Sequence, residues 1–164
     1  MKNLEIKARV KNFNEPQKVI KKFGAKFINR GRQIDTYYVV PNGKFKLRKL
    51  NQKNGELIFY KRKESLNPRW SDYFTFHISK PDKFNKFLQQ IFLTQVVIDK
   101  IRTFYRYKNA RIHLDKVVKL GNFIEIEVEV KNGELQAKKL MKELLNYLKI
   151  PKKNFIKKSY SDLL

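Results

Sequence analysis

Apolar and polar residues alternate with a period of two along much of this chain, which is the pattern of β-strands that bury one face. The clearest example is residues 123–130, where isoleucine or valine occupies every even position and glutamate occupies positions 125, 127 and 129. The alternation predicts about eight strands, most of them antiparallel. They cover residues 3–10, 33–39, 44–48, 56–62, 69–78, 96–107, 111–116 and 123–130.

Helical spacing of apolar residues appears between and after these strands. One helix is expected from Asn14, as its N-cap, to about Phe23. A second follows residues 79–82, which resemble a capping box, and a third covers residues 133–148, with a short helical piece after Pro151. The fold class is therefore α+β. An eight-stranded sheet can close into a barrel, with its apolar faces outward under the helices and its charged faces lining the interior.

The charge balance predicts an anionic partner. The 164 residues include 38 Lys and Arg against 15 Asp and Glu, a formal net charge of +23. Nucleic acid, an anionic membrane surface and a phosphorylated small molecule all meet that requirement. With 41% hydrophobic and 13% aromatic residues, the chain is expected to form one domain over residues 1–164 rather than a disordered basic tail. The lack of cysteine excludes disulfides and thiolate metal sites. The lack of a long apolar run or a leader sequence predicts a cytoplasmic protein.

The charges on the predicted strand faces are segregated by sign. Carboxylates concentrate on the first strand and on the late strand that carries Glu125 and Glu127, whereas Lys and Arg dominate the middle strands. A row of carboxylates suits Mg²⁺ or Mn²⁺, and rows of Arg and Lys suit phosphate oxygens. An ordinary solvated sheet face is the commoner explanation of any single strand, but such a face should mix both signs along every strand. The combined pattern favours a site for a metal–polyphosphate complex.

Several segments also resemble a known family. Residues 3–9 (NLEIKAR) are similar to its N-terminal E-x-E-x-K strand, and residues 35–48, 56–62 and 97–102 are similar to its basic strands. The most specific segments are RIHLD at residues 111–115 and LGNFIEIE at residues 120–127. In order and spacing they resemble the CYTH superfamily, or triphosphate tunnel metalloenzymes, and most closely its class IV adenylyl cyclase-like branch.

The resemblance implies an eight-stranded antiparallel barrel that forms a tunnel for a triphosphate, with Mg²⁺ or Mn²⁺ as cofactor. It implies Glu5, Glu125 and Glu127 as metal ligands, while Asp115 is either a further ligand or the partner of a tunnel cation. One position departs from the family, because Asn3 stands where its first motif glutamate would be. The implied catalytic residues are Glu5, Lys7, Arg62 and Arg111. The implied phosphate-binding residues are Lys7, Arg9, Lys46, Arg48, Arg62, Lys100, Arg102, Arg106 and Arg111.

Three functions are compatible with these features. The first is metal-dependent hydrolysis of a triphosphate, such as ATP, another nucleoside triphosphate, tripolyphosphate or thiamine triphosphate. The second is a class IV adenylyl cyclase that converts ATP to cyclic AMP and pyrophosphate. The third is a non-catalytic module that binds polyphosphate or nucleic acid. Nucleic acid is the less favoured partner, no membrane is expected, and a monomer and a homodimer both fit. His113 lies on the face of Arg111 and Asp115, where a histidine bonded to a neighbouring polar group is the commoner finding.

Overall fold

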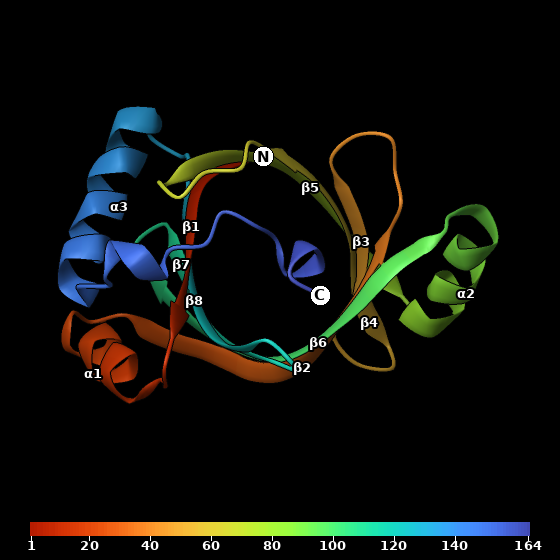
Figure 1. Cartoon of the computed structure of the whole chain (residues 1–164), viewed down its shortest axis with the longest axis horizontal. Coiled ribbons are helices and arrows are strands. Elements are labelled where there is room, and N and C mark those ends of the chain that lie inside the picture. Colours follow the sequence, from red (N-terminus) through yellow and green to blue (C-terminus); the bar gives the residue numbers. More distant parts are fainter.

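The alternating segments form eight strands in the computed structural model, which describes residues 1–164. The strands pair antiparallel throughout and close into a barrel in the ring order β1-β5-β4-β3-β2-β6-β7-β8 (Figure 1). The predicted α+β barrel is therefore confirmed. The strands are β1 (Lys2–Val10), β2 (Lys26–Tyr38), β3 (Lys44–Lys49), β4 (Asn54–Arg62), β5 (Arg69–Ser79), β6 (Thr94–Tyr107), β7 (Ala110–Val117) and β8 (Gly121–Glu129).

Strand β2 is much longer than its sequence pattern predicts. It begins at Lys26 rather than near residue 33, and its added half is exposed through Arg32. The added half pairs with β6, beginning with Lys26 opposite Arg106, so backbone hydrogen bonds hold it in place. Because neither of its faces is buried there, no alternation of apolar residues marks it in the sequence.

Three helices cover the outside of the barrel. Helices α1 (Asn14–Lys22) and α3 (Glu134–Leu148) lie together beside β1 and β7, and α2 (Pro81–Ile91) lies on the opposite side (Figure 1). None of the helices has the length and apolar content needed to cross a membrane.

The two predicted helix caps are wrong. Phe13 occupies the N-cap position of α1, and the side chain of Asn12 accepts a hydrogen bond from the Asn14 backbone N–H instead. Ser79 cannot cap α2 because it belongs to β5 and pairs with β4. Lys80 makes the turn between strand and helix with a φ of 52°, and no side chain caps α2.

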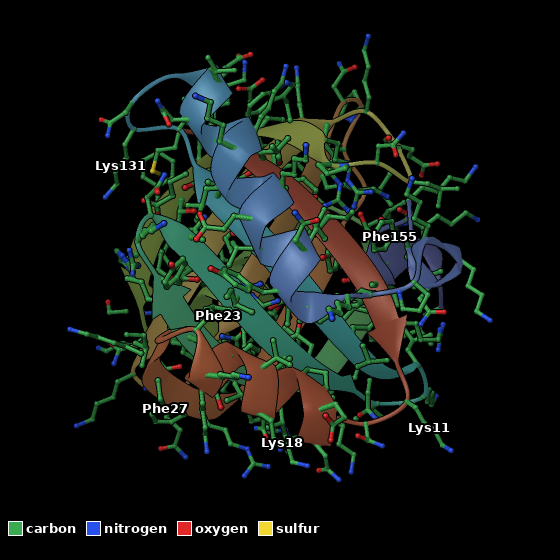
Figure 2. All side chains as sticks on the ribbon, turned by 90° about the vertical axis from the view of Figure 1, so that its left-hand side faces the viewer. Lys11, Lys18, Phe23, Phe27, Lys131 and Phe155 are labelled. Carbon is green, nitrogen blue, oxygen red and sulfur yellow. The ribbon has the colours of Figure 1, made fainter.

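The main hydrophobic core lies outside the barrel. Its fifteen buried residues come from the outward faces of β1, β7 and β8, from Tyr105 on β6, and from the helices α1 and α3, which Figure 2 shows packed across the strands. Phe23 packs against this core at the end of α1. A smaller cluster of Tyr38, Leu47 and Leu88 lies under α2. Each fully buried Leu, Ile or Val contributes roughly 1.5–3 kcal/mol. Because the outer faces provide this stability, the barrel interior can hold polar side chains.

The C-terminal segment occupies one opening of the barrel. After α3 the chain passes through a 3₁₀ turn, η1 (Lys152–Asn154), and its second 3₁₀ turn, η2 (Tyr160–Asp162), lies inside the ring (Figure 1). There Tyr160 joins a buried cluster that includes Tyr37 and Phe123. The Ser159 and Asp162 side chains cap η2 reciprocally. The segment thus forms an apolar layer at one end of an otherwise charged interior.

Candidate active site in the barrel interior

The interior of the barrel contains a cavity of about 710 Å³. This volume lies within the usual range for small-molecule sites. Most of its lining residues are charged or polar, because alternate residues of each strand point inward. All but one of the predicted phosphate-binding residues line the cavity, as do three of the four predicted metal ligands. The lining residues among them are Lys7, Lys46, Arg48, Arg62, Lys100, Arg102, Arg106, Arg111, Glu5, Glu125 and Glu127.

Arg9 and Asp115 do not line the cavity. Arg9 is exposed at the end of β1, where it donates a hydrogen bond to the Leu120 carbonyl oxygen and lies over the Phe123 ring. Asp115 is fully buried and accepts two hydrogen bonds from Arg102, at 2.7 and 2.6 Å, and one from the Tyr160 hydroxyl at 2.9 Å. Asp115 therefore has the second of its two expected roles, as the partner of a tunnel cation, and that cation is Arg102.

Three of the cavity cations converge on one buried carboxylate, Asp35. Its oxygens accept hydrogen bonds from Lys46 at 2.7 Å, from Arg48 at 2.8 and 3.0 Å, and from Lys100 at 2.6 Å. Burial alone would raise the pKa of Asp35, but the three cations, Arg48 foremost, hold it well below its usual value. Burial also lowers the pKa of Lys100 to about 7, against the opposing effect of Asp35. Asp35 thus positions a compact group of the side chains that were predicted to bind phosphate.

Carboxylates collect beside a second group of cations. Glu125 lies 3.3 Å from the Lys7 ammonium and accepts a hydrogen bond from Arg102 at 2.9 Å. Glu127 forms an ion pair with Arg111 at 2.8 Å. Burial opposes ionisation of both carboxyls, but Lys7 holds the pKa of Glu125 well below its usual value and Arg111 lowers that of Glu127. Both carboxylates are therefore charged at neutral pH and balanced by cations.

Glu5 is held apart from this carboxylate pair. It pairs with Arg62 and accepts a hydrogen bond from Arg69 at 3.2 Å. Arg69 had no predicted role, although it lies at the start of the strand predicted at residues 69–78, on the face opposite Phe74 and Phe76. Its position on the face opposite these apolar residues could have indicated that Arg69 points into the barrel. The donor atoms that lie within 4.8 Å of one another come instead from Glu125, Glu127 and His113.

The residues beside Glu127 fit a divalent cation. The Asn3 amide nitrogen donates to Glu127 at 3.3 Å, which leaves the buried Asn3 Oδ1 without a partner. His113 Nδ1 is also buried and has no hydrogen-bond partner. Burial, reinforced by Arg102, lowers the pKa of His113 and favours its neutral form. Two carboxylates and two buried polar atoms without hydrogen-bond partners form a set of ligand atoms suited to a cation, with the Asn3 oxygen available where the family glutamate is missing.

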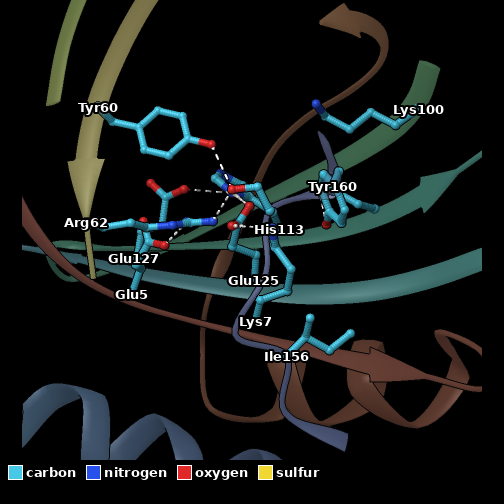
Figure 3. A network of polar contacts seen from close by, with 12 residues as sticks. Glu5, Lys7, Tyr60, Arg62, Lys100, His113, Glu125, Glu127, Ile156 and Tyr160 are labelled. Carbon is cyan, nitrogen blue, oxygen red and sulfur yellow. Dashed lines mark hydrogen bonds and ion pairs between the residues drawn. The ribbon is translucent and has the colours of Figure 1, made fainter. Parts of the chain in front are cut away.

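The C-terminal segment contacts the same side chains. The Lys7 ammonium lies 3.7 Å from the centre of the Tyr160 ring, and Arg62 donates to the Ser159 hydroxyl at 2.7 Å (Figure 3). The backbone N–H of Ile156 donates to the Lys7 carbonyl oxygen at 2.9 Å. Ser159 was not predicted as a site residue.

Known proteins share this fold over the whole chain. The sequence model of the CYTH domain matches residues 1–160. A Methanocaldococcus jannaschii protein named "putative adenylate cyclase MJ0240" is 28% identical over 99% of this chain and 98% of its own. The PH1012 protein of Pyrococcus horikoshii has a TM-score of 0.87 and 25% identity over 99% of both chains. HpAC1 of Hippeastrum, described as a "putative adenylyl cyclase" that reveals a dominant triphosphatase activity, has a TM-score of 0.67 and 12% identity over 99% of this chain and 92% of its own.

Proposed function

The chain belongs to the CYTH domain family, and we propose that it binds a triphosphate with a divalent cation in the barrel cavity and hydrolyses the terminal phosphate. The observation that carries the proposal is the distribution of charge inside the cavity. Eight of the predicted phosphate-binding Lys and Arg side chains line it, and the carboxylate pair Glu125–Glu127 lies beside two buried polar atoms without hydrogen-bond partners. Divalent-metal dependence is general among the tunnel enzymes of this family.

The cations would bind the triphosphate. Lys46, Arg48 and Lys100 already converge on the Asp35 carboxylate, which shows that their charged ends can meet around an anion. Arg side chains can contact two phosphate oxygens at once. Arg62 and Arg111 now pair with Glu5 and Glu127, and phosphate oxygens offer them the same kind of acceptor. Substrate binding would therefore exchange one set of ion pairs for another.

Hydrolysis requires positioning and charge neutralisation more than a dedicated base. Water would add to the terminal phosphorus, the bridging P–O bond would break, and the water proton would leave to a carboxylate or to solvent. Glu125, Glu127 and the Asn3 oxygen would hold the cation. Mg²⁺ or Mn²⁺, when bound, would neutralise phosphate charge and orient the water. Lys7 and Arg111, beside these carboxylates, would neutralise charge that develops on the phosphate oxygens.

Cyclisation of ATP is the second candidate. The ribose 3′-hydroxyl would attack the α-phosphorus and pyrophosphate would leave, with the same cavity holding the phosphates. The name of the Methanocaldococcus relative, which is 28% identical, favours this reaction. The description of the Hippeastrum protein favours hydrolysis, although at 12% identity that likeness concerns the fold alone. Because hydrolysis needs only a water molecule beside the terminal phosphate, it makes fewer demands on the cavity, and we favour it.

Product analysis separates these functions. The protein is incubated with ATP or tripolyphosphate and with Mg²⁺ or Mn²⁺, and the products are resolved by ion-exchange chromatography. We expect orthophosphate from both substrates, and a rate reduced on the order of 100-fold or more in Glu127→Gln. The matched control is Glu134→Gln, which removes an exposed carboxylate paired with Lys2 outside the barrel and should leave the rate unchanged. Cyclic AMP with pyrophosphate would instead establish the cyclase, and no turnover of either substrate would contradict both reactions.

A further inference from the structure

His113 has an unusual environment for a buried histidine. Only 5% of its surface is exposed, and its Nδ1 atom has no hydrogen-bond partner. That atom lies 3.7 Å from a Glu127 oxygen and 4.0 Å from a Glu125 oxygen, beyond hydrogen-bond distance of either. A buried polar atom without a partner costs about 1–3 kcal/mol, so its persistence requires an explanation.

The fold holds the imidazole firmly in this position. His113 on β7 lies directly opposite Glu125 on β8, and both side chains point into the cavity. The edge of the ring packs against Phe104 on β6, with 5.2 Å between ring centres and 66° between planes. Figure 3 shows His113 beside Glu125 and Glu127 at the centre of the polar network. The nitrogen is thus fixed next to two carboxylates by packing rather than by a hydrogen bond of its own.

We propose that His113 Nδ1 is a direct ligand of the divalent cation held by Glu125 and Glu127, and that the site therefore favours Mn²⁺ over Mg²⁺. The inference rests on the cation site of the proposed function and adds a nitrogen ligand to it. The three donor groups already lie within 4.8 Å of one another. Mg²⁺ strongly prefers oxygen ligands, whereas imidazole nitrogen suits first-row transition metals. The neutral nitrogen also adds no charge to a cluster whose carboxylates already face Lys7, Arg102 and Arg111.

The composition of the chain allows a direct spectroscopic test. It contains two histidines and no cysteine, and the second histidine, His77, is exposed near Glu56. Untagged protein is mixed with Mn²⁺ and tripolyphosphate, neither of which contains nitrogen, and frozen for pulsed electron paramagnetic resonance. We expect a ¹⁴N coupling to Mn²⁺ that changes to ¹⁵N when the protein is labelled with ¹⁵N-histidine. The coupling should persist in His77→Gln and disappear in His113→Gln. In titrations with each metal alone, His113→Gln should weaken Mn²⁺ binding about tenfold or more and leave Mg²⁺ binding nearly unchanged.

Several results would overturn the proposal. They are Mn²⁺ bound to the unsubstituted protein without nitrogen coupling, coupling lost in His77→Gln, and no Mn²⁺ bound at all. If His113→Gln does not fold, the labelled and unlabelled forms of the unsubstituted protein, together with His77→Gln, still decide the question. The outcome is separable from the proposed reaction. Nitrogen coupling without turnover would support the ligand and contradict hydrolysis, whereas turnover without coupling would do the reverse.

Discussion

Replacing Asp35 by asparagine should destabilise the barrel far more than the loss of an exposed carboxylate. Asp35 has no exposed surface and accepts hydrogen bonds from Lys46, Arg48 and Lys100. The substitution keeps the size of the side chain but leaves the buried Lys46 and Lys100 without their counter-charge. Arg48 keeps only the more distant Glu56, at 3.6 Å. Removing one partner of a buried ion pair costs about 3–5 kcal/mol. For a chain of this size, that loss corresponds to a fall in Tm of about 6–20 °C.

The matched control is Asp99→Asn. Asp99 also accepts two hydrogen bonds from one arginine, Arg32, at 2.9 and 2.6 Å, but this pair is exposed. Exposed ion pairs contribute about 0–1 kcal/mol, so the free energy of unfolding and the Tm of the control should be close to those of the parent protein. Both variants are compared by urea denaturation and by thermal melting.

A second arm of the same experiment links stability to binding. Tripolyphosphate at about 100 times its Kd stabilises a folded protein by about 2.7 kcal/mol. The increase in Tm should be larger for Asp35→Asn than for the parent protein, because the anion replaces the missing carboxylate among Lys46, Arg48 and Lys100. The assigned role of Asp35 is refuted if the free energies of unfolding of Asp35→Asn and Asp99→Asn differ by less than about 1 kcal/mol. It is also refuted if tripolyphosphate raises the Tm of Asp35→Asn less than that of the parent protein.

Two further predictions concern the other parts of the site. The pKa of Lys100 is lowered to about 7, so its charge is lost as the pH rises through that value. Tripolyphosphate affinity, measured by calorimetry, should therefore fall more between about pH 6 and about pH 8 in the parent protein than in Lys100→Met, and equal slopes would contradict this. Tyr160→Phe removes one hydrogen bond to Asp115, which Arg102 still holds, so unfolding should become easier by only about 1 kcal/mol. Hydrogen exchange of residues 155–164 should nevertheless speed up, unlike in the control Tyr147→Phe, and unchanged exchange would count against anchoring by Tyr160.

Much of the barrel could be predicted because the two faces of its strands differ in polarity. The outward face must be apolar to pack under the helices, and the inward face must be polar to line the cavity, so each strand carries a period of two. The half of β2 before residue 33 carries no such signal, since it is exposed and held by pairing with β6. The predicted cap of α2 was also wrong, because Ser79 pairs within the sheet instead of capping the helix.

The sequence predicted which charged side chains line the site better than it predicted which ion pairs they form. Alternation identifies which Lys and Arg point inward, but the barrel closure decides which of them meet a carboxylate. Asp35 holds Lys100 because the barrel places β2 beside β6, far away in the sequence, and no local pattern reports such a contact. Asp115 instead meets Arg102 directly across the consecutive strands β6 and β7. The contact of Ser159 with Arg62 depends on the return of the chain end into the barrel. His113 was expected to bond a neighbouring polar group, and only the structure could reveal that its Nδ1 atom has no hydrogen-bond partner.

The proposed cation and triphosphate sites are tested most directly by anomalous diffraction at the manganese edge from crystals grown with Mn²⁺ and tripolyphosphate. We expect an anomalous peak beside Glu125, Glu127 and His113, with the triphosphate inside the barrel and contacted by Lys7, Arg62 and Arg111. A triphosphate bound on the outer surface, or an interior that holds neither metal nor phosphate at saturating concentrations, would contradict the proposed sites.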